Sequence, residues 1–379
     1  MEKQIYLDYN ATTPIAPEVA EEMWPYIQTH FGNPSSGYAM GRHNKEAIEK
    51  ARMQVANLIG ALPGEIIFTG GGTESNNHAI RGAVFVNQQK GKHIITSRVE
   101  HPAVKEVCKS LEKQGFEITW LPVDAFEKVN PKDVEKAIGP NTVLVTIMHA
   151  NNEVGTIQPV KEIGEIVKKH GVLFHTDAAQ SVGKIESDIH EMSVDFLSIA
   201  GHKLYAPKGI GALYIRNGVK PENLIFGAGQ ERGLRPGTEN VPYIVALGKA
   251  CEMAGQSLET NGRHLFSLRQ HLLEGLKKKC KTPILLHSDL NNCLPNTLSI
   301  AFENVDAHTL ASLVSKQVLF STGSACHADS VEISPVLKAM QVNPRIAAAT
   351  VRISPGKYTT EEEINQAVEI ISETVNKIV

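Results

Sequence analysis

This chain of 379 residues lacks the features that mark several large classes of protein. Its five cysteines include no CxxC pair, which argues against both a disulfide framework and a zinc site. Its formal charge of −3 leaves no basic surplus for binding nucleic acid. No apolar run suits a membrane span, and no stretch resembles a signal peptide. We therefore expect a cytoplasmic protein that binds neither nucleic acid nor membrane.

What the chain does contain is a series of short apolar runs separated by stretches of helical length. The runs are rich in β-branched residues and nearly continuous in hydrophobicity, as in strands that are buried on both faces. Strands that alternate with helices predict an α/β fold with a mostly parallel sheet. We assign seven strands to residues 65–69, 93–97, 118–122, 142–149, 172–176, 196–199 and 211–215.

The pattern changes after residue 237, where a long helical stretch over 241–280 leads into mixed strands and helices. The last helix begins with a capping box formed by Thr360 and Glu363. A chain of this length is long for one hydrophobic core. We therefore expect a large α/β domain over 16–254 and a smaller α+β domain formed by 1–15 and 255–379.

Ligands of such sheets bind at the carboxyl ends of the strands, and two sequences there suggest a cofactor. Residues 70–73 read GGGT between a strand and a helix, and bare amides at a helix start suit a phosphate, although a flexible turn explains the glycines equally well. Asp177 follows an apolar strand and precedes two alanines, so it needs a positive partner or hydrogen-bond donors. A protonated pyridine nitrogen is one such partner; a protein cation or a helix N-cap role is the alternative.

Lys203 lies in the sequence SIAGHKLYAPKGIG, just after the strand at 196–199. Taken alone, a lysine beside glycines and a proline is most often an ordinary turn residue. At the mouth of a buried strand it can instead bond to a carbonyl cofactor as a Schiff base. His101 ends another strand and offers a flat ring, although a lone histidine more often packs or faces solvent. Together these strand ends favour a pyridoxal phosphate site.

Longer motifs, spread over nearly the whole chain, resemble those of the cysteine desulfurases. These enzymes belong to the class V aminotransferase group of pyridoxal phosphate enzymes and are close to the selenocysteine lyases. The resemblance implies a fold type I transferase that works as a homodimer. It rests, in chain order, on YLDYNATTP, GGTESNN, EHPAV, HANNEVG, HTDAAQSVGK, GHKLYAPKGIGALY, RPGTEN, GSACHAD and VRIS.

The resemblance also implies a role for each matching residue. Lys203 would form the Schiff base and move the substrate α-proton, while Asp177 would pair with the pyridinium nitrogen. His101 would stack on the ring and assist proton transfer. The remaining assignments are Gln180 at the ring hydroxyl, Gly72, Thr73 and His202 at the phosphate, Thr238 at the phosphate of the partner subunit, Asn152 at cofactor and substrate, and Asn10 and Arg352 at the substrate.

Cys326 would be the nucleophile that takes the sulfur. It lies among small residues in STGSACHAD, which predicts a mobile loop, whereas Cys108 and Cys251 fall within helical patterns that favour packing. The alternative is that Cys326 is an inert loop cysteine. A thiolate there would attack the substrate sulfur and carry it onward as a persulfide.

The expected reaction converts L-cysteine to L-alanine and leaves a persulfide on the enzyme for a sulfur acceptor that the sequence does not identify. Selenocysteine lyase is the first alternative, because Ala200 replaces a serine found in many family members and because CHAD leans toward that branch. An aminotransferase is the second; it would release a keto acid and need no Cys326. No metal is expected.

Overall fold

The computed structural model describes residues 4–327 and 330–379, and it describes the side chains of all of these except residues 324–332. The large sheet has seven strands in the order β2-β8-β7-β6-β5-β3-β4, which confirms the predicted mostly parallel α/β fold. Within it, β8 alone runs in the direction opposite to the other six strands. The strands are β2 (Ile66–Thr69), β3 (His93–Ser97), β4 (Glu117–Leu121), β5 (Thr142–Thr146), β6 (Leu173–Asp177), β7 (Phe196–Ala200) and β8 (Gly211–Ile215).

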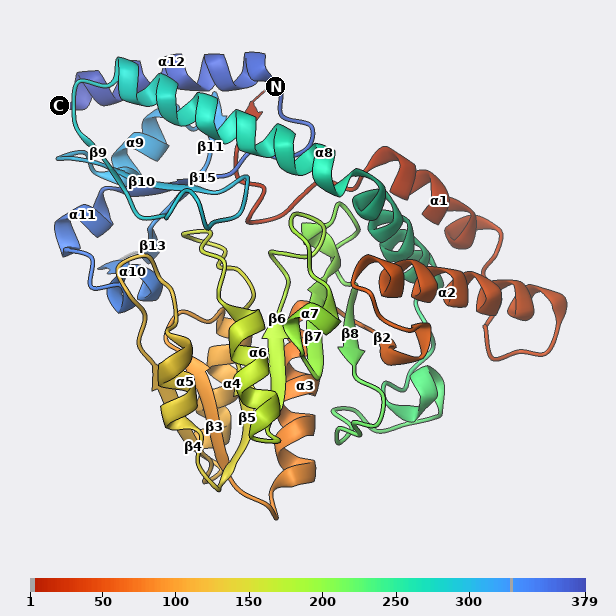
Figure 1. Ribbon diagram of the computed structural model, residues 1–379. Coiled ribbons are helices and arrows are strands. Elements are labelled where there is room, and N and C mark those ends of the chain that lie inside the picture. The colour runs from red at the N-terminus through yellow and green to blue at the C-terminus, as the bar shows by residue number, and fades with distance from the viewer. Residues whose placement is uncertain (1–3, 328–329) are drawn as a thin grey trace.

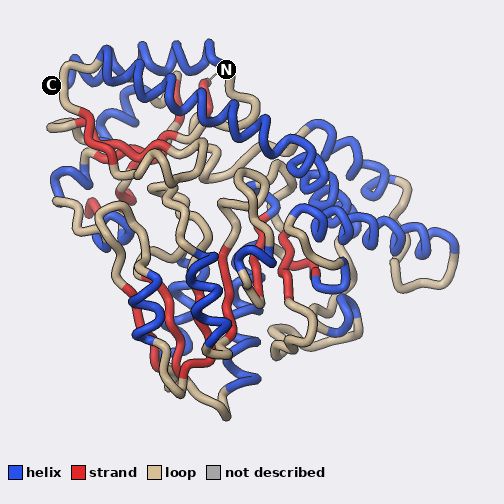
Figure 2. The backbone as a smooth tube through the Cα atoms, in the orientation of Figure 1, coloured by secondary structure: helices blue, strands red, loops and turns tan. Residues whose placement is uncertain are grey.

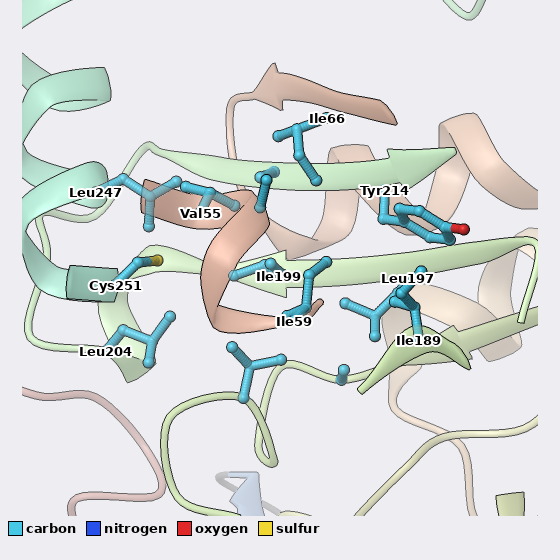
Figure 3. Close-up of a cluster of buried hydrophobic side chains, with 14 of the residues drawn as sticks. Val55, Ile59, Ile66, Ile189, Leu197, Ile199, Leu204, Tyr214, Leu247 and Cys251 are labelled. Carbon is cyan, nitrogen blue, oxygen red and sulfur yellow. The ribbon is translucent and has the colours of Figure 1, made fainter. Parts of the chain in front are cut away.

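Helices cover both faces of this sheet because successive strand residues point to opposite sides (Figure 1). Ile94 and Leu144 contribute to the core beneath α3 and α4. Their neighbours Ile95 and Val145 contribute to the core on the other face, which Figure 3 shows where α2 and α8 meet the sheet. The covering helices are α1 (Pro17–Gln28), α2 (Ala39–Leu58), α3 (Gly72–Asn87), α4 (Pro102–Glu112), α5 (Pro131–Ala137), α6 (Val160–Lys169) and α7 (Ile189–Met192).

Helix α8 (Val241–Lys279) runs from the large sheet to a second, smaller sheet, as the backbone in Figure 2 shows. A second hydrophobic core lies there. That core surrounds an antiparallel sheet in the order β12-β15-β10-β9. The predicted domain boundary at 254/255 falls within α8 and remains a prediction. The elements here are β9 (Ile284–Leu286), β10 (Leu298–Phe302), α9 (Ala307–Val314), β12 (Ser321–Thr322), α10 (Pro335–Ala339), α11 (Pro344–Ala348), β15 (Thr350–Ile353) and α12 (Glu361–Ile378).

Two short pairs complete the fold. Residues 318–322 form two separate strands, because β11 (Val318–Leu319) pairs in parallel with β1 (Ile5–Tyr6) while β12 joins the second sheet. β13 (Ser324–His327) pairs with β14 (Ser330–Ile333). Single turns of 3₁₀-helix lie at Pro63–Glu65, Gly201–Lys203 and Gln230–Gly233. Within residues 4–327 and 330–379, none of the helices is both long and apolar enough to cross a bilayer.

Candidate active site

A cavity of about 450 Å³ opens at the carboxyl ends of the parallel strands. This volume lies within the range of small-molecule and cofactor sites. Every residue predicted to bind cofactor or substrate lines the cavity, apart from Thr238. Those residues are Asn10, Gly72, Thr73, His101, Asn152, Asp177, Gln180, His202, Lys203 and Arg352. The fold therefore gathers side chains from segments that lie far apart in the sequence.

Lys203 ends the 3₁₀ turn that follows β7, and its amine points to the N-terminal segment. Nζ donates hydrogen bonds to the carbonyl oxygens of Asn10 (2.5 Å) and Ala11 (2.7 Å). Burial and then the charge of Arg352 lower the pKa of Lys203 to about 8, against opposing contributions from two carboxylates. The side chain is therefore no ordinary surface lysine, and a substantial fraction of its amine is neutral near physiological pH.

Asp177 is the last residue of β6, and its carboxylate is buried against the cavity. Oδ2 accepts a hydrogen bond from Asn76 Nδ2 (2.7 Å), and Oδ1 accepts one from the Ala179 backbone N–H (3.0 Å). Among the described side chains no cation forms an ion pair with it. Neutral donors thus hold the carboxylate in place, and it remains available to a positively charged ring nitrogen. Sequence reasoning missed Asn76, which lies one helical turn after the glycine loop.

The glycine loop leads into α3, the helix that the sequence predicted after the glycines; it begins at the last of them, Gly72. Gly71 has a φ of 142°, which favours glycine, and a Cβ on Gly72 would come within 3.2 Å of the Ala200 Cβ. Ala200 therefore lies directly beside the loop. His202 also lines this part of the cavity, and burial and the charge of Lys203 lower its pKa to about 4. Backbone amides and a neutral imidazole form a suitable environment for a phosphate.

His101 is the N-cap of α4, and its ring is exposed to the cavity. Nδ1 accepts a hydrogen bond from the Ala103 backbone N–H (3.1 Å). In the neutral ring the proton therefore resides on Nε2. Burial lowers the pKa of His101, while Asp177 opposes the shift. A neutral flat ring over the cavity fits the role expected of this residue.

Arg352, on β15, reaches the cavity from the second sheet. Its Nη2 donates to Asp8 Oδ1 (2.7 Å) and Ser321 Oγ (2.8 Å), and its Nη1 donates to the Asn152 carbonyl oxygen (3.1 Å). Nε is buried and has no hydrogen-bond partner among the side chains that the structure describes. The guanidinium is thus oriented by groups on three segments, and Asp8 and Ser321 are contributors that sequence reasoning missed.

Gln180 and Asn10 form a hydrogen-bonded network beneath the cavity. Gln180 Nε2 donates to the Asn10 carbonyl oxygen (2.9 Å), and Lys184 Nζ donates to Gln180 Oε1 (2.8 Å). Asn10 Nδ2 donates to Thr297 Oγ1 (2.8 Å) and to the Asn152 carbonyl oxygen (3.2 Å). Lys184 was not among the predicted site residues, although it lies within the motif HTDAAQSVGK.

Cys326 lies in β13, where its backbone is paired with Val331, in place of the loop that the sequence predicted. Its side chain lies outside the described residues. The other four cysteines are free, and burial raises the pKa of the thiol in each of them. For Cys108 and Cys251 it reaches about 12. Thiolates at these four positions are therefore strongly disfavoured.

Thr238 is exposed and does not line the cavity of its own chain. Its segment is nevertheless fixed. Glu231 accepts hydrogen bonds from Arg52 Nη1 (2.7 Å) and Nη2 (2.8 Å), and Arg235 Nε donates to Glu74 (2.9 Å). Sequence reasoning missed this buried ion pair, because its two residues are 179 positions apart.

The residues around the cavity fit pyridoxal phosphate. The backbone amides of the glycine loop and the neutral His202 lie in one part of the cavity. Lys203, with its lowered pKa, and the carboxylate of Asp177, held by Asn76, lie elsewhere along its wall. The buried Asn76 Oδ1, which has no partner among the described residues, marks a further polar atom at the cavity wall. The amides suit the phosphate anion, the lysine amine suits the aldehyde, and the carboxylate suits the ring nitrogen of this cofactor.

Comparisons with known proteins agree with this geometry. The sequence profile of the family described as aminotransferase class-V matches residues 5–367. A protein named cysteine desulfurase IscS from Methanosarcina thermophila is 48% identical over 99% of this chain and 93% of its own length. The protein of that name from Dictyoglomus turgidum is 47% identical over 100% of this chain and 96% of its own length.

Solved structures give the same result. A NifS-like protein superposes with a TM-score of 0.93 at 40% identity, covering 99% of this chain and 100% of that one. A structure described as SspA in complex with cysteine has a TM-score of 0.83 at 40% identity, covering 94% of this chain and 99% of that one.

Proposed function

Because the chain belongs to the aminotransferase class-V family and, within it, to the cysteine desulfurases, we propose that it removes the sulfur of L-cysteine. The products are L-alanine and a persulfide on the enzyme. The observation that carries the proposal is the single cavity shared by Lys203, Asp177 and Arg352. A selenocysteine lyase or an aminotransferase is not favoured, since the relatives named above are cysteine desulfurases.

Pyridoxal phosphate is the proposed cofactor, with Lys203 as its point of attachment. When bound, it supplies a carbonyl that bonds to an amine and a ring that takes up the electrons of the broken Cα–H bond. Asp177, held by Asn76, would keep the ring nitrogen protonated. Gly72, Thr73 and His202 would hold the phosphate. His101 would lie against the ring and hold or release a proton at Nε2.

The substrate would enter between Arg352 and Lys203. Arg352 would bind the carboxylate, and the contacts of its guanidinium with Asp8, Ser321 and Asn152 fix its orientation. Once the substrate has displaced Lys203 from the cofactor, its amine would be free. With a pKa lowered to about 8, that amine would accept the substrate α-proton in its neutral form. Asn10 holds that amine through its carbonyl oxygen.

The sulfur step would belong to Cys326. Its thiolate would attack the substrate sulfur and form an S–S bond as the C–S bond breaks, and the carbon would gain a proton to give alanine. The raised thiol pKa values of the other four cysteines support this assignment. A downstream acceptor would then take the terminal sulfur.

Measuring the products tests the function directly. With L-cysteine, the wild-type enzyme should release alanine and form protein persulfide in equal amounts in a single turnover. Lys203→Ala should abolish alanine release together with the visible absorption of bound cofactor. Cys326→Ala should abolish the persulfide. A keto acid in place of alanine would indicate an aminotransferase, and a far larger kcat/KM for L-selenocysteine would indicate a lyase.

A homodimer is the proposed working state. Helix α1 and the loop after it expose Trp24, Phe31 and Tyr38, which is more apolar surface than an isolated subunit needs. A second copy covering this face would account both for that surface and for Thr238, which is exposed and lies outside its own cavity. Sedimentation should give a dimer, and Thr238→Ala should weaken cofactor binding. Active monomers would contradict the proposal.

The cytoplasm is the compartment that we propose, since free thiols at the four described cysteines suit a reducing environment.

A further inference from the structure

Lys184 does not itself line the cavity of the proposed active site, yet it donates to Gln180 and Asn10, two predicted site residues that do. Its Nζ lies 2.8 Å from Gln180 Oε1 and 3.1 Å from Asn10 Oδ1. It is largely buried and lines a small cavity of about 40 Å³ behind Lys203. Among the described residues no carboxylate forms an ion pair with it. A largely buried lysine whose hydrogen bonds to described residues go to two amide oxygens calls for an explanation.

The contacts of Lys184 determine which end of the Gln180 amide faces the cavity. Nε2 is held by the Asn10 carbonyl oxygen, which can only accept. Oε1 is held by Lys184. The Asn10 side chain is itself fixed, because its Nδ2 donates to Thr297 and Asn152 and its Oδ1 accepts from Asn296 (3.0 Å) as well as Lys184. Gln180 therefore has one Nε2 hydrogen that no described residue accepts.

We propose that Lys184 is a positioning residue that presents the Gln180 N–H, rather than its carbonyl oxygen, to the ring oxygen of the cofactor. This inference rests on the proposed function, in which Gln180 faces that oxygen. An N–H donor stabilises the ionised oxygen, whereas an amide oxygen would repel it. Lys184 can do this whether or not it carries a charge, because a neutral amine still has two hydrogens for its two acceptors.

The first experiment compares Lys184→Met, which has a chain of similar length and no donor, with the wild type. The cofactor-free protein is titrated with pyridoxal phosphate to obtain the dissociation constant, and the visible spectrum of the bound cofactor is recorded. We expect the dissociation constant to rise about tenfold, as for the loss of a hydrogen bond to a charged group. The absorption should move toward the form with an un-ionised ring oxygen.

Lys249→Met is the matched control, because Lys249 is also partly enclosed, with 28% of its side chain exposed, but pairs with Glu252 on α8 instead of lying beneath the cavity. It should behave as the wild type does. Circular dichroism of the cofactor-free proteins checks their folding. Should Lys184→Met fail to fold, Lys184→Gln takes its place, since the shorter amide cannot reach both oxygens, with the same expected changes.

A double-mutant cycle with Gln180→Ala decides whether Lys184 acts through Gln180. In that background the Lys184 substitution should change neither the dissociation constant nor the spectrum further. The proposal would be overturned if Lys184→Met had the same effect in the wild type and in Gln180→Ala. A Lys184→Met variant with the spectrum of the wild type would overturn it as well. If Gln180→Ala alone has no effect on the cofactor, the role of Gln180 in the proposed function is wrong. A normal Lys184→Met beside a defective Gln180→Ala overturns only the inference about Lys184.

Discussion

The acidity of Lys203 is the property of the site that can be measured before any cofactor is added. Burial and the charge of Arg352 lower the pKa of its amine from 10.5 to about 8. At pH 7 about one molecule in ten would then carry a neutral amine, compared with about one in three thousand at the ordinary value. The structure therefore predicts an amine that is roughly 300-fold more available than that of an ordinary lysine.

The assay is competitive labelling of the cofactor-free chain with a trace of acetic anhydride, which reacts only with neutral amines. Labelling of the peptide that contains Lys203 is followed by mass spectrometry from pH 6 to pH 11. It should rise with pH, reach half of its maximum near pH 8 and level off about one pH unit higher. The same peptide in the unfolded chain supplies the reference, with its midpoint near the ordinary value of 10.5.

The contribution of charge is tested separately with Arg352→Gln. Removing the guanidinium removes the main charge that opposes protonation of Lys203, while Asp8 and Asp177, which favour protonation, remain. The midpoint for Lys203 should therefore move to higher pH in this variant. Two results would refute the reasoning. One is a labelling midpoint near pH 10.5 for Lys203 in the wild type, and the other is a midpoint in Arg352→Gln that is the same as in the wild type or lower.

Three further predictions concern the scaffold around the site. Glu231→Gln removes the buried carboxylate from Arg52, since both side chains are only 4% exposed, and leaves Arg52 with the half-exposed Glu49 as its carboxylate partner; it should lower the free energy of unfolding by about 3 kcal/mol in chemical denaturation, and a loss below about 1 kcal/mol would contradict this. Ala200→Ser places a hydroxyl beside the Gly72 loop and should tighten cofactor binding several-fold by titration, whereas unchanged or weaker binding would argue against a phosphate there. Asp177→Asn should keep the fold by circular dichroism yet lose most alanine formation, because an amide does not hold the ring nitrogen protonated; turnover within a few-fold of the wild type would exclude the assigned role.

The sequence by itself determined the local elements and the chemistry of the strand ends. Apolar runs of strand length fixed the seven strands of the large sheet, because burial on both faces demands continuous hydrophobicity. The glycines before Thr73 and the capping box at Thr360 are local signals, and both match the structure. Helix α2 is an exception, since it begins at Ala39 within the stretch GNPSSGYAMG, whose glycines and serines favour a loop. Packing of its face overrides that weak local preference.

Only the tertiary structure decided which side chains hold the predicted residues in place. Asp8 meets Arg352 across 344 positions of sequence, and Asn76 meets Asp177 across 101. No periodicity encodes such contacts, because they depend on how β1, α3 and the two sheets come together. The same holds for Lys184, whose place in a motif was visible while its two amide acceptors were not. The reactive groups can be recognised in the sequence, but their orientation and acidity arise from burial and from neighbours that folding supplies.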